Sequence, residues 1–246
     1  MVRIEAITEP ITIKIDRSPK VHQQADAVDV AWDKLCAQNP RYFNGKMLAF
    51  DSYDASTGVI RASVEQYKNH AVRDTVDVGI SLLAVTAMLY AEGENDMEYL
   101  LGKRSPELHR YGGLWELGPS GGVDVPRFRK TLNPKRIVAE LCREVSEEIG
   151  IKISNPPYHP IALVHDDAVG STDIAIQVLV DGMPNLKLNW EYTQTRWMSL
   201  DELYQSTQNN PEEFIPTTTA LATEMWRRWT NLGFTEDEIE QLRCTD

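Results

Sequence analysis

Residues 134–151, PKRIVAELCREVSEEIGI, carry the pattern that decides the fold. Asn133 suits the N-cap of a helix, Pro134 its first position and Gly150 the residue just past its end. Apolar residues recur at three- and four-residue intervals, as they do on one face of a helix. They are Ile137, Val138, Leu141, Cys142, Val145 and Ile149. The pattern therefore predicts an amphipathic helix that packs one face on a core.

A second stripe of this helix is acidic and consists of Glu140, Glu144, Glu147 and Glu148. At about 100° per residue, these carboxylates fall within an arc of roughly 100°. Like charges at this spacing destabilise a helix by roughly a few tenths of a kcal/mol per pair, and a divalent cation would offset that repulsion. The alternative is a solvated acidic face, which is common because glutamate is a good helix former. Spacing alone leaves both interpretations open.

Two motifs carry a resemblance to a known family. Residues 143–151, REVSEEIGI, match the distal half of the Nudix box: Arg-Glu, an aliphatic, any residue, Glu-Glu, any residue, Gly, an aliphatic. Upstream, residues 115–117, WEL, precede Gly121 and Gly122 and resemble the WELPGG segment that enters the box. The chain thus resembles the Nudix hydrolase superfamily over about residues 78–205.

The chain departs from the family pattern in the loop before the helix. Gly122 and Arg143 are 21 positions apart, seven more than in the family pattern. The first glutamate of the box would fall on Lys135 and is therefore missing. Glu140 lies one turn before Glu144 and is a candidate to take its place.

Composition limits the class of protein. With 246 residues, the chain is long enough for a sizeable core in one large domain or two. A net charge of −12 disfavours a nucleic-acid polymer as partner, but it permits a nucleotide, because a bound cation inverts the local field. The three cysteines show neither disulfide nor zinc spacing. No signal peptide or long apolar run is evident, so we expect a cytoplasmic protein that does not enter a membrane.

The order of predicted elements favours an α/β fold with a mixed sheet between helices, and the resemblance implies a Nudix α/β/α sandwich. Residues 1–75 are expected to form a small α+β region that packs on a main domain, residues 76–246. Strands are predicted at 1–15 (interrupted by Pro10), 47–50, 59–67, 76–90, 98–103, 158–165, 173–180 and 194–198. Further helices are predicted at 21–37, from 200, at 214–232 and at 236–243.

The N-terminal region carries a second, shorter resemblance. Residues 39–45, NPRYFNG, together with Tyr67 and Lys68, resemble a Nudix subgroup that includes UDP-glucose diphosphatases. The alternative is plain turn chemistry, since Asn-Pro and Asn-Gly mark turns in many proteins.

The resemblance also assigns roles to residues. Glu144, Glu147 and Glu148 are expected to ligate Mg²⁺, with Mn²⁺ as an alternative, and to act in catalysis. Arg143 is expected to orient a glutamate by an ion pair, although a surface ion pair would look the same. Expected substrate contacts come from Arg104, Arg110, Glu116, Gly121 and Gly122. Magnesium prefers oxygen ligands and takes a few carboxylates together with substrate phosphates.

One of Asp166, Asp167 and Asp173 is expected to serve as a base or an extra ligand, and the sequence leaves open which. The predicted reaction is the hydrolysis of a phosphoanhydride bond in a nucleoside diphosphate linked to another group, preferably a nucleotide sugar. Alternatives are a hydrolase of ADP-ribose or dinucleotides, and a Nudix-like sensor that binds a nucleotide without cleaving it. Because Nudix proteins are often dimers, a homodimer is a further expectation.

Overall fold

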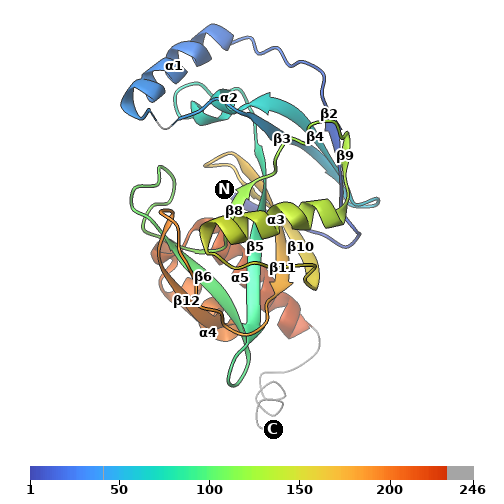
Figure 1. Ribbon diagram of the computed structural model, residues 1–246, viewed down its shortest axis with the longest axis vertical. Helices are drawn as coiled ribbons and strands as arrows, with labels where there is room; N and C mark the ends of the chain where they lie inside the picture. Colours follow the sequence, from blue (N-terminus) through green and yellow to red (C-terminus); the bar gives the residue numbers. More distant parts are fainter. Residues whose placement is uncertain (41, 232–246) are drawn as a thin grey trace.

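The computed structural model describes residues 1–40 and 42–231, which form a mixed α/β fold around a sheet of twelve strands (Figure 1). The strands are β1 (Val2–Ala6), β2 (Thr12–Asp16), β3 (Lys46–Asp54), β4 (Val59–Gln66), β5 (Leu82–Glu92), β6 (Met97–Arg104), β7 (Trp115–Leu117), β8 (Ser120–Gly122), β9 (Thr131–Leu132), β10 (Tyr158–Asp166), β11 (Ser171–Leu179) and β12 (Tyr192–Ser199). The helices are α1 (Ala25–Gln38), α2 (Tyr67–Ala71), α3 (Pro134–Glu148), α4 (Leu200–Asn209), the short 3-10 helix η1 (Pro211–Glu213) and α5 (Pro216–Asn231). The predicted fold class is confirmed.

Alternate residues of the central strands face two different cores, and this places helices on both faces of the sheet. On β5, Leu83 and Val85 belong to the core that contains the apolar face of α3. Met88 belongs to the core that contains Leu203 of α4 and Leu221 of α5. Since successive strand residues point to opposite faces, α3 covers one face of the sheet, and α4 and α5 cover the other.

Helix α3 begins and ends where the sequence predicts. The Asn133 side chain accepts a hydrogen bond from the backbone N–H of Arg136 at 3.1 Å, which makes it the N-cap. Gly150 follows the helix with a φ of +76°, a conformation that costs little only for glycine. The buried residues of the helix are Ile137, Val138, Leu141, Val145 and Glu148. The predicted apolar stripe is confirmed, and one carboxylate is buried with it.

The predicted strand at 76–90 begins later, at Leu82. Gly79 has a φ of +75°, and its N–H donates to the Asp77 carboxylate at 2.8 Å, so this segment turns instead of extending. From Leu82 onward the strand is largely buried, pairing in parallel with β11 and antiparallel with β3, β6 and β8. Strand β5 is therefore the central strand, as predicted.

The N-terminal region shares the sheet with the rest of the chain. The strands predicted at 47–50 and 59–67 are present as β3 and β4, which pair as an antiparallel hairpin, while β1 pairs with β10 and β2 pairs with β4 and β9. Helix α1 begins at Ala25 rather than near Val21, because Val21 is 94% exposed and has no core to pack on. The division into residues 1–75 and 76–246 stays a prediction.

The helix predicted from residue 200 is α4, and it begins with a capping box. Ser199 accepts a hydrogen bond from the Glu202 N–H, and the Glu202 carboxylate accepts one from the Ser199 N–H. The predicted helix at 214–232 is α5, and the helix predicted at 236–243 lies outside the described residues. No helix within residues 1–40 and 42–231 is long and apolar enough to cross a membrane.

Candidate active site

A cavity of about 210 Å³ lies on the α5 side of the sheet. Its floor uses alternate residues of neighbouring strands, with Gly122 of β8 opposite Ala84 of β5, and Ala84 opposite Asp173 of β11. The five predicted substrate contacts, Arg104, Arg110, Glu116, Gly121 and Gly122, all line this cavity. The structure thus brings these residues together, and their role in binding stays a prediction.

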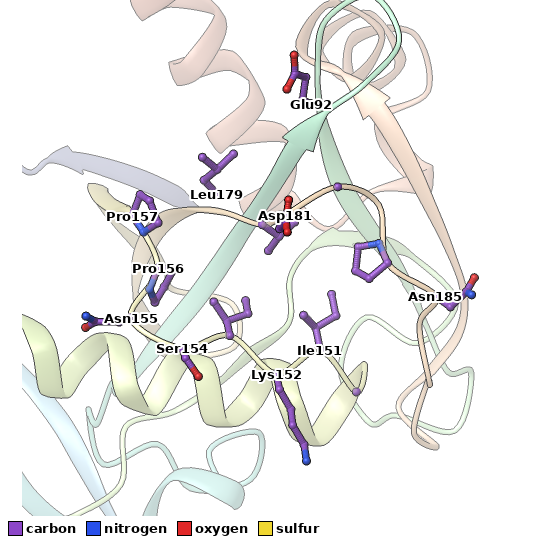
Figure 2. Close-up of a pocket in the computed structure, with 15 residues that line it drawn as sticks. Glu92, Ile151, Lys152, Ser154, Asn155, Pro156, Pro157, Leu179, Asp181 and Asn185 are labelled. Carbon is purple, nitrogen blue, oxygen red and sulfur yellow. The ribbon is translucent and has the colours of Figure 1, made fainter.

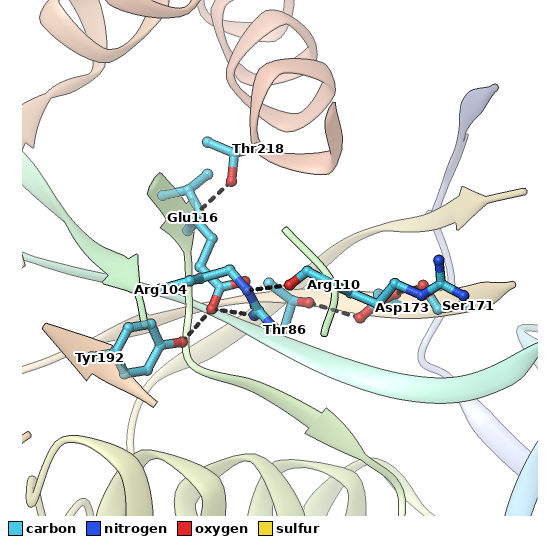
Figure 3. Close-up of polar contacts among 9 residues, drawn as sticks. Thr86, Arg104, Arg110, Glu116, Ser171, Asp173, Tyr192 and Thr218 are labelled. Carbon is cyan, nitrogen blue, oxygen red and sulfur yellow. Dashed lines mark hydrogen bonds and ion pairs between the residues drawn. The ribbon is translucent and has the colours of Figure 1, made fainter. Parts of the chain in front are cut away.

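A buried charged network forms one wall of the cavity (Figure 3). Nη1 of Arg104 donates to both carboxylate oxygens of Glu116 at 2.8 Å, and the Tyr192 hydroxyl donates to the same carboxylate at 2.5 Å. Glu116 is only 1% exposed. A Cβ on Gly102 would overlap the Tyr192 ring, so the glycine makes room for this contact. A buried charge destabilises the fold unless it is paired and hydrogen-bonded. Arg104 provides the ion pair for Glu116, and Tyr192 adds a hydrogen bond.

The acidic stripe of α3 ends beside this network. Glu148 is 5% exposed, and burial, followed by the nearby carboxylates of Glu191, Glu116 and Glu144, raises its pKa to about 9. Burial also raises the pKa of Glu144. The Tyr192 hydroxyl contacts Glu148 as well as Glu116. Four carboxylates therefore gather where the C-terminal end of α3 meets β7 and the segment before β12.

Arg143 forms an ion pair with a glutamate, as the resemblance implies, and it also pairs with further carboxylates. Its guanidinium lies 2.7 Å from Glu144, 3.0 Å from Glu147 and 3.4 Å from Glu140 and from Asp124. Glu140, the candidate for the missing first glutamate, therefore contacts the arginine of the box. Arg143 holds Glu144 and Glu147 in one arrangement, and Glu147 remains largely exposed there.

The donor chemistry of this cluster fits a hard divalent cation. Glu144, Glu148 and Glu116 bring three carboxyl groups together in a buried region, and Mg²⁺ prefers such oxygen donors. Within residues 1–40 and 42–231, however, no three Asp, Glu, His or Cys side chains already converge on one point as metal ligands. Ligation by all three predicted glutamates therefore requires rotation of side chains that Arg143 now holds.

Strand β8 separates the two halves of the site. Gly121 faces α3, and a Cβ there would lie 2.6 and 2.7 Å from the carboxylate oxygens of Glu144. Gly122 faces the cavity. The predicted ligands Glu144, Glu147 and Glu148, together with Arg143, are not part of the cavity lining. Glu116 belongs to both halves, because it lines the cavity and lies close to Glu148.

The structure separates the three aspartates whose roles the sequence leaves open. Asp166 and Asp173 line the cavity. Asp166 accepts a hydrogen bond from the Tyr111 hydroxyl at 2.6 Å. The Asp167 side chain is 58% exposed and lies 3.9 Å from Arg3, outside the cavity lining.

Several residues of the site were not found from the sequence, and His70 and Tyr192 are two of them. His70 on α2 lines the cavity, so the N-terminal region contributes to it. Arg110 ties this region to the loop after β6 through a 2.6 Å ion pair with Asp74. Tyr192 is the second of these residues. The sequence feature related to it is Gly102, a glycine on the paired strand β6 that leaves room for the Tyr192 ring. Neither contact has a local sequence pattern.

A second, larger hollow of about 650 Å³ lies between residues 150–157 and 179–185 (Figure 2). Its charged lining residues are Glu92, Lys152 and Asp181, all exposed. None of the predicted site residues lines it.

No family model and no curated protein matches the chain. Among solved structures it is similar to the MutT protein from Methanosarcina mazei Go1, at 23% identity and a TM-score of 0.44 over 60% of this chain and 94% of that one. It is also similar to the NUDIX domain of Shewanella oneidensis NrtR complexed with ADP ribose (18%, TM-score 0.45, 61% and 88%) and to a C. elegans Ap4A hydrolase (14%, TM-score 0.43, 61% and 98%). These similarities do not assign the chain to a family.

Proposed function

We propose that the chain is a Nudix-type hydrolase that cleaves a phosphoanhydride bond in a nucleoside diphosphate linked to another group, preferably a nucleotide sugar. The observation that carries the proposal is the position of Glu116. This buried carboxylate lines the cavity and also adjoins Glu148 in the acidic cluster of α3. A substrate that reaches from the cavity to that cluster would place phosphate oxygens beside carboxylates able to hold a cation.

The proposed cation is Mg²⁺, with Mn²⁺ as the alternative, held by Glu148 and, after they leave Arg143, by Glu144 and Glu147. When bound, such an ion polarises a phosphoryl oxygen and stabilises the leaving phosphate. Tyr192 limits the freedom of Glu148 through its hydroxyl. A site on a helix held this way keeps its groups in place during the reaction.

The cavity side of the site would bind and orient the substrate. Gly121 and Gly122 have no side chains, so a diphosphate approaches their backbone closely. Arg104 and Arg110 each carry five N–H donors. Some of these donors bind Glu116 and Asp74, and the remaining ones are available to donate hydrogen bonds to the anionic diphosphate. Because both arginines are already anchored by carboxylates, little conformational entropy is lost when a diphosphate binds.

One observation favours a second candidate, a nucleotide-binding protein without hydrolase activity. Arg143 pairs with Glu144 and Glu147, two of the three predicted ligands. If these ion pairs persist in solution, nucleotide binding would not depend on a cation. Substrates such as ADP-ribose or dinucleotides remain alternatives within the hydrolase class.

The test is a screen for product release with and without magnesium over nucleotide sugars, ADP-ribose, dinucleotides and nucleoside triphosphates. We expect hydrolysis of a nucleotide sugar that a Glu147→Gln, Glu148→Gln double variant reduces by more than about 100-fold, since loss of a residue that only orients a metal ligand already costs about 10- to 100-fold. The matched control is Glu212→Gln with Glu213→Gln, an adjacent exposed pair on η1. Magnesium-independent binding without turnover would favour the nucleotide-binding protein instead.

A further inference from the structure

The cavity floor leads from the glycines of β8 to Asp173. Gly122, Ala84 and Asp173 are paired in register on β8, β5 and β11 and line the same cavity. Neighbouring strands lie about 4.8 Å apart, so Asp173 is roughly 10 Å from Gly122 along this row. The first two residues of the row carry no side chain and a single methyl group. A ligand therefore meets no bulky side chain from Gly122 or Ala84 on the way to the aspartate, and the Leu82 side chain borders this path beside Gly122.

Asp173 is held in place by two neutral hydroxyl groups (Figure 3). Oγ of Ser171 donates to Oδ2 at 2.7 Å, and Oγ1 of Thr86 donates to Oδ1 at 3.1 Å. A carboxylate offers about four lone-pair sites, so about half remain for other donors. No Lys, Arg or His in the described part of the chain lies within ion-pair distance of Asp173.

Such a group discriminates between ligands by charge and by hydrogen bonding. Burial raises the pKa of Asp173 to about 6, so the carboxylate is mostly ionised at pH 7 and above. An ionised carboxylate without a cation repels phosphate and accepts hydrogen bonds from hydroxyl groups. Tyr111 and Asp166 add a second hydrogen-bonded pair to the same cavity. This end of the cavity therefore suits a neutral, hydroxyl-bearing group and disfavours an anionic one.

We propose that Asp173 is a specificity-determining residue whose carboxylate accepts hydrogen bonds from the hydroxyl groups of the neutral moiety attached to the diphosphate. The inference rests on the proposed function, in which the phosphates lie near Gly121 and Gly122. It adds that this end of the cavity prefers a neutral sugar to a sugar that carries an acidic group.

The test compares wild type with Asp173→Asn, which keeps the size of the side chain and removes its charge. We expect KM for UDP-glucose or ADP-ribose, whichever the wild type hydrolyses, to rise about 10- to 100-fold, as for a lost hydrogen bond to a charged group. The value of kcat should change less than KM, and the Kd for UDP or ADP, which lack the distal sugar, should stay the same. Relative activity on UDP-glucuronic acid, whose sugar is anionic, should improve.

Asp167→Asn is the matched control, because Asp167 is a neighbouring aspartate outside the cavity. Thr86→Val, which removes one of the two hydroxyls that hold Asp173, should raise KM in the same direction by a smaller factor. An unchanged KM in Asp173→Asn, or an equal loss of affinity for UDP and UDP-glucose, overturns the inference while hydrolysis by the wild type still supports the proposed function. A wild type that neither binds nor hydrolyses any of these nucleotides overturns both.

Discussion

Of two hollows in this protein, the smaller one rather than the larger one has the buried charge that marks a candidate active site. The larger one, at about 650 Å³, is bordered by turns and prolines, and its charged residues are exposed. The smaller one, at about 210 Å³, contains the buried ion pair of Arg104 and Glu116. Exposed charges are solvated at little cost, whereas buried charges destabilise the fold unless they are paired. Buried charge thus distinguishes the candidate site from a surface groove of larger volume.

The largest effect is expected where β8 touches α3. Gly121→Ala would place a methyl group 2.6 and 2.7 Å from the carboxylate oxygens of Glu144 and displace them. We expect hydrolysis to fall by about 100-fold, because a displacement of 1 Å at a catalytic group has that effect. The control is Gly45→Ala, where the nearest atom would be on the exposed Phe43 ring at 3.3 Å. Full activity in a folded Gly121→Ala protein would show that the position of Glu144 does not matter.

A smaller effect is expected from the group that joins the two halves of the site. Tyr192→Phe removes the hydroxyl that contacts Glu116 and Glu148. We expect the magnesium concentration for half-maximal hydrolysis to rise about tenfold, the lower end of the effect of removing a group that hydrogen-bonds to a metal ligand. Tyr158→Phe, at an exposed tyrosine, is the matched control. If Tyr192→Phe needs the same magnesium concentration as wild type and Tyr158→Phe, the Tyr192 hydroxyl does not support the metal site.

His70 provides a test of the cavity wall that needs no substrate. Burial, helped by the charges of Arg73 and Arg110, lowers the pKa of His70 to about 4. The unfolded chain then binds more protons between about pH 6.5 and 4, so the free energy of unfolding should fall as the pH drops through this range. We expect a loss of roughly 1–3 kcal/mol, and His70→Gln should remove most of it.

Chemical denaturation at pH 7 and at pH 4.5 measures this loss, with the exposed His159→Gln as control. The same pH dependence in His70→Gln and wild type would mean that His70 is solvated.

The smallest effect is expected at the larger hollow. Lys152→Ala and Asn185→Ala remove exposed side chains that line it. Hydrolysis and stability should stay within about twofold and about 0.5 kcal/mol of wild type, as for ordinary surface positions. A tenfold loss of hydrolysis in either variant, measured with the preferred nucleotide, would contradict the comparison of the two hollows.

Helix α3 shows how much of the fold was available from local sequence. Its N-cap at Asn133, its apolar stripe and its end before Gly150 depend on residues within a turn of one another, and the capping box of Ser199 and Glu202 is equally local. The start of β5 was predicted too early, because the Asp77–Gly79 turn interrupts an apolar run that periodicity alone cannot divide.

The order of amino acids alone specified the acidic and apolar faces of α3, since a helical repeat brings residues three and four apart together. The resemblance of residues 143–151 to a known motif then marked Glu144, Glu147 and Glu148 as the candidate catalytic residues. Folding decided which of these carboxylates is buried and which partners they have. Tyr192 and Glu116 are 76 positions apart and meet only because β12 pairs with β6 and β6 with β7. Asp173 and Gly122 share a cavity floor only because both of their strands pair with β5. Contacts of this kind depend on strand order and register, and no short-range pattern in a chain records them.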